Sequence, residues 1–318
     1  MLYHLANYVH RMADLKKVVV TGASGRVGQF VVQRLIDEGI QVRATQSPNR
    51  HSSLKESLQT SPLLETVVFD LRCPNTADAL LAECDALVHC AFAHAPGRYR
   101  GGEGRDAAGF WRANLLATQA LLDASGRCGT SRVILLSSRA VYGGQSSKVV
   151  SDASPVAPDS HYGALKRAEE SLLAIASRRY GFDGASLRAT GIYGVLTDIS
   201  ESKWFKECKQ VTAGQPITEV RAGTEVHGDD LADALWRLLR VPAGTLASRI
   251  FNCSDQWVSS RMLARELNQL TDQELVLPDP VPPETVQGVM RCDGLASLGW
   301  QPAGYARVID VLKELLNS

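Results

Sequence analysis

The fold is decided by residues 16–28, which read Lys-Lys-Val-Val-Val-Thr-Gly-Ala-Ser-Gly-Arg-Val-Gly. The three consecutive valines predict a short strand buried on both faces, as in a parallel sheet. After the strand, Val27, Val31 and Leu35 recur at the spacing of one helix face, and Gly39 ends the predicted helix. The segment therefore predicts a strand, a glycine turn and a helix.

The three glycines of this turn each allow a different close approach. Gly22 makes the sharp turn, Gly25 lets a pyrophosphate approach the backbone, and Gly28 lets the helix contact the strand. Unpaired N–H groups at the positive end of the helix then face the phosphates. Glycines in this pattern also occur in ordinary tight turns, but here a second strand follows at 40–45, within one βαβ unit. We therefore predict dinucleotide binding.

The overall composition excludes several classes of protein. The 318 residues include 34 basic and 34 acidic ones without a basic run, which argues against a nucleic-acid partner. Seven scattered cysteines without a CxxC pair predict reduced thiols in a cytoplasmic protein and no metal site. No apolar run reaches the ~18 residues of a membrane span. Residues 1–15 are expected to be an N-terminal extension and are excluded from the fold prediction.

Predicted strands and helices alternate along most of the chain, which indicates an α/β fold with a doubly wound parallel sheet. We expect a nucleotide-binding domain over 16–194, to which strands return from about 218–255. A smaller C-terminal lobe, mainly 195–318, is expected to bind substrate. Further strands are predicted at 66–69, 86–90, 132–137, 185–188 and 249–253, and helices at 74–83, 106–125, 162–180, 201–214, 229–239 and 259–271.

A second group of residues has the pattern of an acid/base site. Tyr162 and Lys166 are four apart and share a helix face. A tyrosine base near neutrality needs its pKa lowered by roughly 3 units, or about 4 kcal/mol. A lysine cation about 4 Å away supplies an energy of that order at an effective dielectric constant of about 20. An ordinary surface helix could have the same spacing, but Ser138, at the end of a predicted strand, could bind a substrate oxygen.

Several further motifs occur in a fixed order and resemble one family. The chain is similar to the extended short-chain dehydrogenases/reductases, the NAD-dependent epimerase/dehydratase family, from about Lys16 to the C-terminus. The motifs that carry the resemblance are Thr21–Gly28, Asp70-Leu71, His89-Cys90-Ala91, Asn114, Ser137–Gly143, Tyr162–Lys166, Leu187–Gly194, Val226–Asp230 and Leu298–Pro302.

The resemblance implies a Rossmann-type domain and a role for each matched residue. Ser138 lies four residues before the tyrosine of Val-Tyr-Gly and would be the catalytic serine, Tyr162 the acid/base, and Lys166 the residue that holds the nicotinamide ribose. A homodimer through the helices of Asn114 and Tyr162 is also implied. The predicted cofactor-binding residues are Gly22, Gly25, Arg26, Val27, Gly28, Gln46, Asp70, Leu71, Ala91, Tyr162 and Lys166.

Two other matched segments have simpler interpretations beside the functional ones. Asn114 either orders the site or is a helix amide that bonds to backbone. His227, followed by Asp229 and Asp230, fits a turn and helix cap better than catalysis. The loop 92–104 either reads a polar substrate or is a solvated connection.

The second predicted strand bears on the choice of cofactor. Gln46 stands where an NAD enzyme usually has Asp or Glu for the adenosine ribose. Without that carboxylate a 2′-phosphate is not repelled, and Arg26, Arg43 or Arg50 could reach it. The sequence therefore predicts NAD or NADP, with a slight preference for NADP.

Departures from the family pattern narrow the reaction. Arg139-Ala140 replaces the acidic pair of sugar dehydratases, and Gly223 replaces an arginine of nucleotide-sugar epimerases. We expect hydride transfer to or from a hydroxyl-bearing carbon of a sugar or nucleotide sugar. The alternative activity is an NADPH-dependent reductase of a non-sugar ketone or aldehyde. A non-catalytic dinucleotide sensor is a third reading, but it has no need of the Ser138, Tyr162 and Lys166 set.

Overall fold

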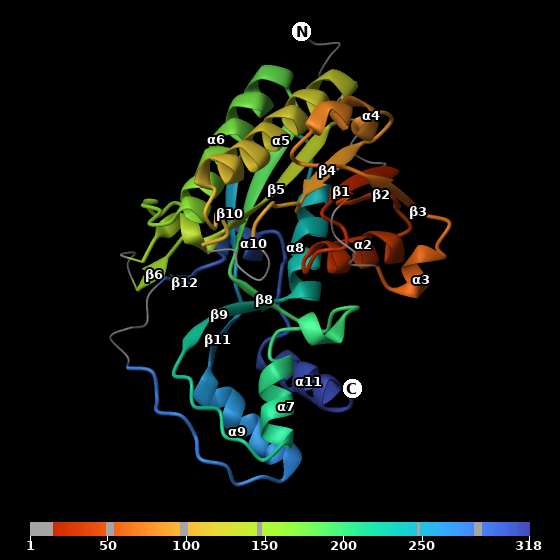
Figure 1. Ribbon diagram of the computed structural model, residues 1–318. Helices are drawn as coiled ribbons and strands as arrows, with labels where there is room; N and C mark the ends of the chain where they lie inside the picture. Colours follow the sequence, from red (N-terminus) through yellow and green to blue (C-terminus); the bar gives the residue numbers. More distant parts are fainter. Residues whose placement is uncertain (1–14, 49–53, 96–100, 145–147, 247–248, 283–287) are drawn as a thin grey trace.

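A computed structural model of the chain describes residues 15–48, 54–95, 101–144, 148–246, 249–282 and 288–318 (Figure 1). Its centre is a seven-stranded sheet in which every pair of neighbouring strands is parallel. The strand order is β10-β7-β5-β4-β1-β2-β3, so the predicted doubly wound sheet is confirmed. The strands are β1 (Lys17–Thr21), β2 (Gln41–Gln46), β3 (Leu64–Val68), β4 (Ala86–His89), β5 (Arg132–Ser138), β7 (Asp183–Ala189) and β10 (Arg249–Cys253).

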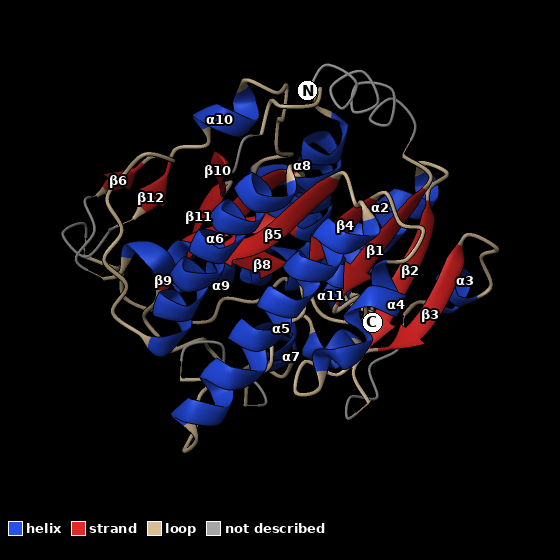
Figure 2. Cartoon of the chain, turned by 90° about the horizontal axis from the view of Figure 1, so that it is seen from above, coloured by secondary structure: helices blue, strands red, loops and turns tan. Residues whose placement is uncertain are grey.

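Successive residues of a strand point to opposite faces of the sheet, and here the residues on both faces are apolar. Helices therefore cover both faces. In β1, Val18 and Val20 pack into a core with α2 and α8, whereas Val19 packs into a core with α4, α5 and α6. From above, the strands lie side by side between the helices (Figure 2). The helices are α2 (Gly28–Asp37), α4 (Ala77–Leu81), α5 (Ala107–Cys128), α6 (His161–Tyr180) and α8 (Gly228–Arg240).

The direction of winding reverses between β1 and β4, which are neighbours in the sheet. Thr21, the last residue of β1, lies opposite His89, the last residue of β4. Ligands of such sheets bind in the crevice at the carboxyl ends of the two strands where the order reverses. The glycine turn follows Thr21 directly and so lies at that crevice.

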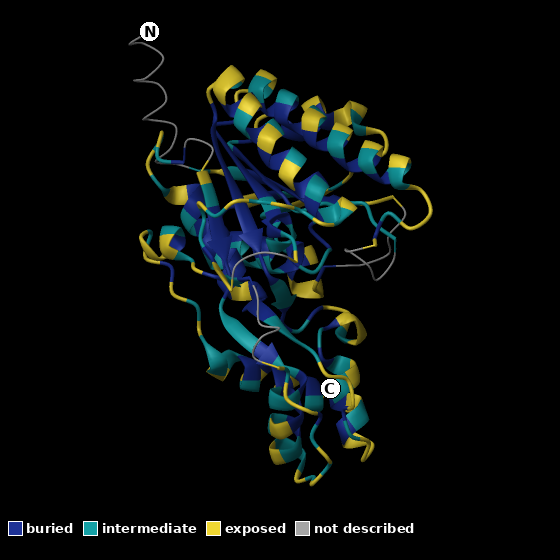
Figure 3. Ribbon diagram, turned by 90° about the vertical axis from the view of Figure 1, so that its left-hand side faces the viewer, coloured by how far each residue is buried: buried dark blue, intermediate teal, exposed yellow. Residues whose placement is uncertain are grey.

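A smaller lobe below the sheet has its own apolar core. Three helices form it, α7 (Phe205–Thr212), α9 (Ser260–Thr271) and α11 (Tyr305–Leu316), together with Tyr193 and Trp204. A three-stranded sheet, β8 (Gly191–Tyr193), β9 (Ala222–His227) and β11 (Gln256–Ser259), lies between this core and the main domain (Figure 1). Figure 3 shows the inward surfaces of both parts buried and the outer helix faces exposed.

Some predicted bounds differ from the observed ones. The helix expected at 201–214 begins at Phe205, because a 3₁₀ turn precedes it and Trp204 adopts φ +71°. Helix α8 comes from the part assigned to the lobe but packs on the main sheet. The helix expected at 74–83 is divided into η1 (Pro74–Thr76) and α4. The sequence did not predict β8, β11 and α11, nor the short elements α3 (Glu56–Gln59), η2 (Arg139–Tyr142), β6 (Val149–Val150), η3 (Ile199–Glu201), β12 (Val289–Met290) and α10 (Asp293–Ala296).

Three general features bear on function. Within the described ranges, no helix combines the length and apolar character needed to cross a bilayer. The seven cysteines are all free thiols. Among the same described residues, no three His, Cys, Asp or Glu side chains are grouped so that they could hold a metal ion. The predicted extension at 1–15 lies outside the described part except for Leu15.

Candidate active site

The glycine turn is shaped by two close contacts and one open position. Gly22 has φ +67°, and a Cβ there would lie 2.7 Å from the Cα of Ala91. A Cβ on Gly28 would lie 2.2 Å from the carbonyl oxygen of Gly22. At Gly25 a Cβ would meet only that same oxygen, at 3.1 Å. The fold therefore requires the first and third glycines, whereas the middle glycine leaves room beside the backbone.

The residues predicted near adenosine lie at the ends of β2 and β3. Gln46 ends β2, and Asp70 accepts a hydrogen bond from the backbone N of Arg72 at 2.9 Å in the turn after β3. Leu71 packs against the core beneath α4 and α5. This turn lies where β3 ends, and the place of these residues beside an adenosine stays a prediction.

One of the three arginines considered for a 2′-phosphate is engaged elsewhere. The guanidinium of Arg43 donates to the Leu80 carbonyl at 2.8 Å and to Glu65 at 3.0 Å. The suggestion that Arg43 reaches a 2′-phosphate is therefore wrong. Arg26 points to the lobe, with its guanidinium 3.4 Å from Glu201, and Arg50 lies outside the described residues.

The two serines at the end of β5 have different surroundings. Ser137 is buried and donates to Glu170 at 2.6 Å. Ser138 is half-buried, and its Oγ accepts from the backbone N of Ala140 at 3.1 Å, which caps η2. Of the pair, Ser138 is the one that remains at the open end of the strand.

Tyr162 lies in the first turn of α6, close to the turn that follows Ser138. A Cβ on Gly163 would lie 2.3 Å from the Ala140 carbonyl, so α6 approaches η2 more closely than a side chain would allow. The tyrosine ring packs edge-on against Phe92, with 5.1 Å between ring centroids. Tyr162 and Ser138 are thus brought to the same edge of the sheet.

Lys166 is buried one helical turn further along α6. Its ammonium donates to Glu169 at 2.9 Å and lies 4.3 Å from the centre of the Phe92 ring. Burial lowers the pKa of Lys166, but the Glu169 carboxylate and the Tyr162 phenolate outweigh burial and raise that pKa above its ordinary value. Lys166 therefore stays charged at neutral pH.

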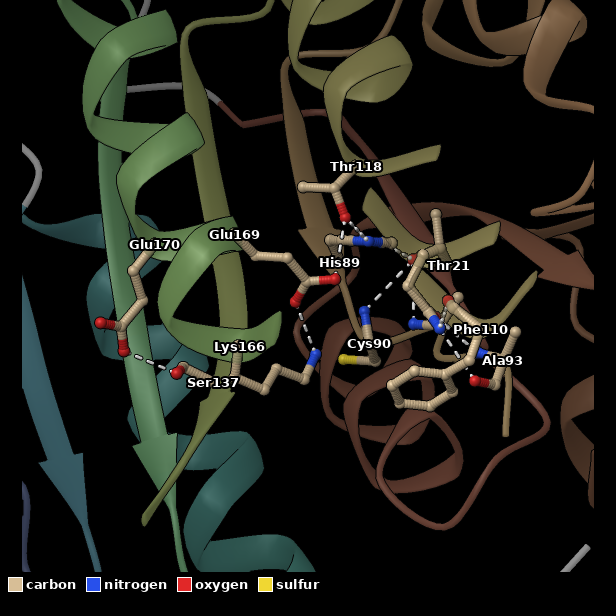
Figure 4. Close-up of polar contacts among 12 residues, drawn as sticks. Thr21, His89, Cys90, Ala93, Phe110, Thr118, Ser137, Lys166, Glu169 and Glu170 are labelled. Atoms are coloured by element: carbon tan, nitrogen blue, oxygen red, sulfur yellow. Dashed lines mark hydrogen bonds and ion pairs between the residues drawn. The ribbon is translucent and has the colours of Figure 1, made fainter. Parts of the chain in front are cut away.

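Buried polar side chains connect this lysine to the glycine turn (Figure 4). Glu169 accepts from the Thr118 hydroxyl at 3.1 Å, and Thr118 lies 3.2 Å from Nε2 of His89. Nδ1 of His89 lies 2.6 Å from the hydroxyl of Thr21. Burial, with the nearby Lys166 charge, lowers the pKa of His89 to about 3, so this ring is neutral at physiological pH.

Cys90 and Asn114 complete the surroundings. Burial raises the pKa of the Cys90 thiol to about 12, so this residue is not a nucleophile at neutral pH. The Asn114 amide bonds to both backbone groups of Ala93, at 2.7 and 2.9 Å. Its role is therefore to anchor the chain after β4, the structural alternative considered above.

The His227 segment also has a structural role. Nδ1 of His227 accepts from the backbone N of Asp229 at 3.1 Å and caps α8. Its ring packs edge-on against Phe30 of α2, with centroids 5.6 Å apart. The predicted turn and helix cap are confirmed.

Three residues of the site were not singled out from the sequence. Glu169, Thr118 and Phe92 contact Lys166 or continue its polar chain. The signals were present, because Glu169 lies three residues after Lys166 and Thr118 four after Asn114, each on one helix face. Their meaning depended on knowing that α5 and α6 pack side by side.

Comparisons with known proteins agree with this fold. A UDP-glucose 4-epimerase from Azospirillum brasilense is 26% identical over 335 residues, which cover 95% of this chain and 91% of that protein. The structure of a UDP-glucose 4-epimerase from Thermotoga maritima with UDP-glucose matches with a TM-score of 0.77 at 20% identity, covering 95% of this chain and 97% of that one. DesIV, a dTDP-glucose 4,6-dehydratase from Streptomyces venezuelae solved with NAD and TYD bound, gives 0.76 at 22% identity, covering 95% and 96%.

The two solved structures are too distant in sequence to show more than the fold. The model of the NAD dependent epimerase/dehydratase family, by contrast, matches residues 18–254, which include the glycine turn and the Tyr162–Lys166 segment. The chain therefore belongs to the NAD dependent epimerase/dehydratase family, a family of extended short-chain dehydrogenase/reductase enzymes.

Proposed function

We propose that the enzyme transfers a hydride between a nicotinamide dinucleotide and a hydroxyl-bearing carbon of a sugar or nucleotide sugar. The observation that supports this most directly is the arrangement of Ser138, Tyr162 and Lys166 along β5, η2 and α6, at the same edge as the glycine turn. This arrangement combines a proton donor or acceptor, a hydroxyl for the substrate oxygen and a fixed cation.

The residues at the crevice fit a dinucleotide. The open side of Gly25 and the N-terminus of α2 would hold the pyrophosphate, together with Gly22, Arg26, Val27 and Gly28. The adenosine would lie beside Gln46, Asp70 and Leu71, and the nicotinamide ribose beside Ala91, Tyr162 and Lys166. When bound, the nicotinamide supplies or accepts the hydride. With Arg43 engaged elsewhere, we propose this cofactor class without a preference for NADP.

Each catalytic side chain has a role that follows from its bonds. Since Oγ of Ser138 accepts from Ala140, its own hydrogen is available to a substrate oxygen. Tyr162 exchanges a proton with that oxygen. Lys166 has three N–H donors, of which one goes to Glu169 and the others can hold ribose hydroxyls.

The smaller lobe and the outer helices suggest two kinds of partner. We assign the lobe, mainly 195–318, to substrate binding because it lies below the main sheet, where β7 continues into β8 (Figure 1). On α5 and α6, Leu116 is 50% and Ile175 56% exposed, and both are large apolar residues. We propose that these helices pair with a second copy of the chain. Sedimentation equilibrium measurements would test this, and a monomer would contradict it.

One observation favours the alternative substrate. Gly223 has no side chain where a pyrophosphate-binding arginine would be expected, and nearby Arg221 forms ion pairs with Glu207 and Glu219. This arrangement favours a reductase of a non-sugar ketone or aldehyde. Nucleotide released from the purified, denatured protein distinguishes the two by mass spectrometry. Retained NAD(H) in equal amount favours a redox-neutral epimerase, and an empty protein that binds NADPH favours the reductase.

The catalytic assignment is tested with Tyr162→Phe once a substrate is identified. We expect kcat to fall by about 10² to 10⁴-fold, as for loss of an acid/base group. The matched control is Tyr180→Phe, at the other end of the same helix, whose hydroxyl bonds Asp123. Undiminished turnover in Tyr162→Phe would refute the assignment.

A further inference from the structure

Glu169 is a carboxylate in the interior of the protein, where an unpaired charge is costly. Its residue is 0% exposed, and the Lys166 residue is 4% exposed. The pair is separated by 2.9 Å on consecutive turns of α6. Burial raises the pKa of Glu169, and the charge of Lys166 and the hydroxyl of Thr118 oppose that rise. A buried charge at this position therefore requires partners that favour it.

The hydroxyl of Thr21 lies at the end of the chain of hydrogen bonds that leads away from Glu169, and it fixes the direction of those bonds. It accepts from the backbone N of Cys90 and from that of Ala91, both at 3.2 Å. With both lone pairs used, its hydrogen is donated to Nδ1 of His89. A neutral His89 that accepts at Nδ1 carries its proton on Nε2.

The same direction continues toward the lysine. Nε2–H of His89 donates to Thr118, and the Thr118 hydroxyl donates to Oε1 of Glu169. Lys166 donates to Oε2. Every contact to Glu169 is thus a donor to it, so the chain of bonds fits an ionised carboxylate. A proton on Glu169 would weaken the bonds from these donors, because a neutral carboxyl group accepts less strongly than a carboxylate.

The other groups that face Lys166 do not replace this carboxylate. From α6 there is Tyr162, from the end of β4 there is the neutral His89, and directly after β4 there is Cys90. Phe92 presents its ring to the ammonium. Glu170 also lies on α6, but its oxygens bond Ser137 and Arg188. Glu169 is therefore the ionised partner of Lys166 at neutral pH.

We propose that Glu169 is a positioning residue for catalysis, which keeps Lys166 charged and pointed at the crevice and is itself held by Thr118, His89 and Thr21. The proposal rests on the role given to Lys166 under the proposed function. This chain of buried hydrogen bonds connects Lys166 to Thr21, the residue that precedes the glycine turn. The two halves of the proposed cofactor site are therefore joined by one set of bonds.

The test compares Glu169→Gln with wild type in the cofactor-free protein. In the variant, Lys166 is buried without a carboxylate, so its pKa falls below the value of about 10.4 in the unfolded chain. Between these two pKa values the unfolded state binds more protons, so the variant gains stability as pH rises. In wild type the raised pKa of Lys166 keeps this contribution constant until higher pH. The Tm difference between the proteins should therefore narrow from about pH 8 to about pH 10.

Glu170→Gln is the matched control. Glu170 is the next residue and equally enclosed, but its cationic partners are Arg188 and Arg167, which keep their charge throughout this pH range. Its Tm difference from wild type should be independent of pH between about pH 8 and about pH 10. A pH-dependent difference of the same size in both variants would overturn the proposal.

Activity supplies a second readout that a purely structural role would not move. In Glu169→Gln the alkaline limb of the kcat profile should shift to lower pH by about one unit or more. An unmoved limb, together with a constant Tm difference, would overturn the proposal while leaving the proposed function intact. Full activity in Tyr162→Phe would overturn the proposed function and, with it, the positioning role.

A measurement on the wild-type chain covers the case in which Glu169→Gln does not fold. In protein labelled with ¹⁵N-lysine, the Lys166 ammonium signal is identified by its absence in Lys166→Met. It should persist to a higher pH than the signals of exposed lysines. Titration together with the exposed lysines, or at lower pH, would overturn the proposal.

Discussion

Glu169 and Glu170 are neighbours on α6, and both are buried, yet they point to different parts of the molecule. Glu170 accepts two hydrogen bonds from Arg188 of β7, both at 2.8 Å, one from Ser137 of β5 and a longer one, at 3.2 Å, from Arg167 on its own helix. Glu169 accepts from Lys166 on its own helix and from Thr118 on α5. Figure 4 shows the two carboxylates directed to opposite sides of the helix.

The difference lies in the cation that each glutamate meets. An arginine keeps its charge and bonds a carboxylate through a planar pair of donors, so the Glu170 pair fastens α6 to two strands. A lysine has rotatable donors and a pKa that its surroundings move. The Glu169 pair therefore leaves Lys166 able to bind other groups while it remains charged. Two adjacent acidic residues thus serve the fold and the site separately.

The largest expected effect comes from breaking the structural ion pair between Glu170 and Arg188. In Glu170→Ala, Arg188 is left 3% exposed without its carboxylate. The free energy of unfolding should fall by about 3 to 5 kcal/mol, as for other broken buried pairs. Urea unfolding monitored by circular dichroism measures it. A loss of unfolding free energy below about 1 kcal/mol is typical of an exposed ion pair. It would contradict the structural role given to the Glu170 pair.

Replacing both members of the other pair should separate stability from activity. In Lys166→Met with Glu169→Leu, no buried charge is left unpaired, so the free energy of unfolding should be unchanged or higher by about 1 to 4 kcal/mol. The loss of the cation should lower kcat by about 10² to 10⁴-fold. Urea unfolding and steady-state kinetics measure the two quantities. A double variant less stable than either single variant would count against this interpretation.

The glycine turn at the far end of the Glu169 chain allows a matched pair of substitutions. Gly28→Ala places a methyl group 2.2 Å from the Gly22 carbonyl and should cost about 1 to 3 kcal/mol of stability. Gly25→Ala meets one oxygen at 3.1 Å and should fold, but the methyl group occupies the space proposed for pyrophosphate. Isothermal titration with NADH and NADPH should show weaker binding. Equal stability of the two variants would contradict the assignment of Gly28 to packing.

The effect that is smallest within a single pH unit concerns acid stability. His89 has a pKa of about 3 because it is buried and close to Lys166, whereas an unfolded histidine titrates near 6.5. Between these values only the unfolded chain takes up the proton, so stability falls on acidification by about 1.4 kcal/mol per pH unit. The variant His89→Asn should remove this contribution to the pH dependence of the unfolding free energy. Urea unfolding at several pH values measures this pH dependence. His227→Asn serves as a comparison, because the pKa of His227, about 4, also lies below that of an unfolded histidine. An unchanged slope in His89→Asn would refute the assignment.

Local sequence patterns were sufficient for much of the fold. The predicted strand at 249–253 and the helix at 162–180 agree with β10 and α6 to within one residue, because their apolar patterns and glycine stops are local. The choice of Ser138 over Ser137 stays a prediction, and the buried bond of Ser137 to Glu170 supports it. Arg43 was misjudged, since the carbonyls that hold it belong to α4, which is distant in sequence.

The sequence by itself determined the alternating strands and helices of a parallel sheet, the glycine turn after the first strand and the shared helix face of Tyr162 and Lys166, because each depends on local patterns along the chain. Only the tertiary structure decided that Thr118 and His89 would meet Glu169, and that Glu169 rather than Glu170 would meet Lys166. These contacts join α5, α6 and β4, and packing between elements is set by the shapes of both surfaces, which no single stretch of sequence encodes.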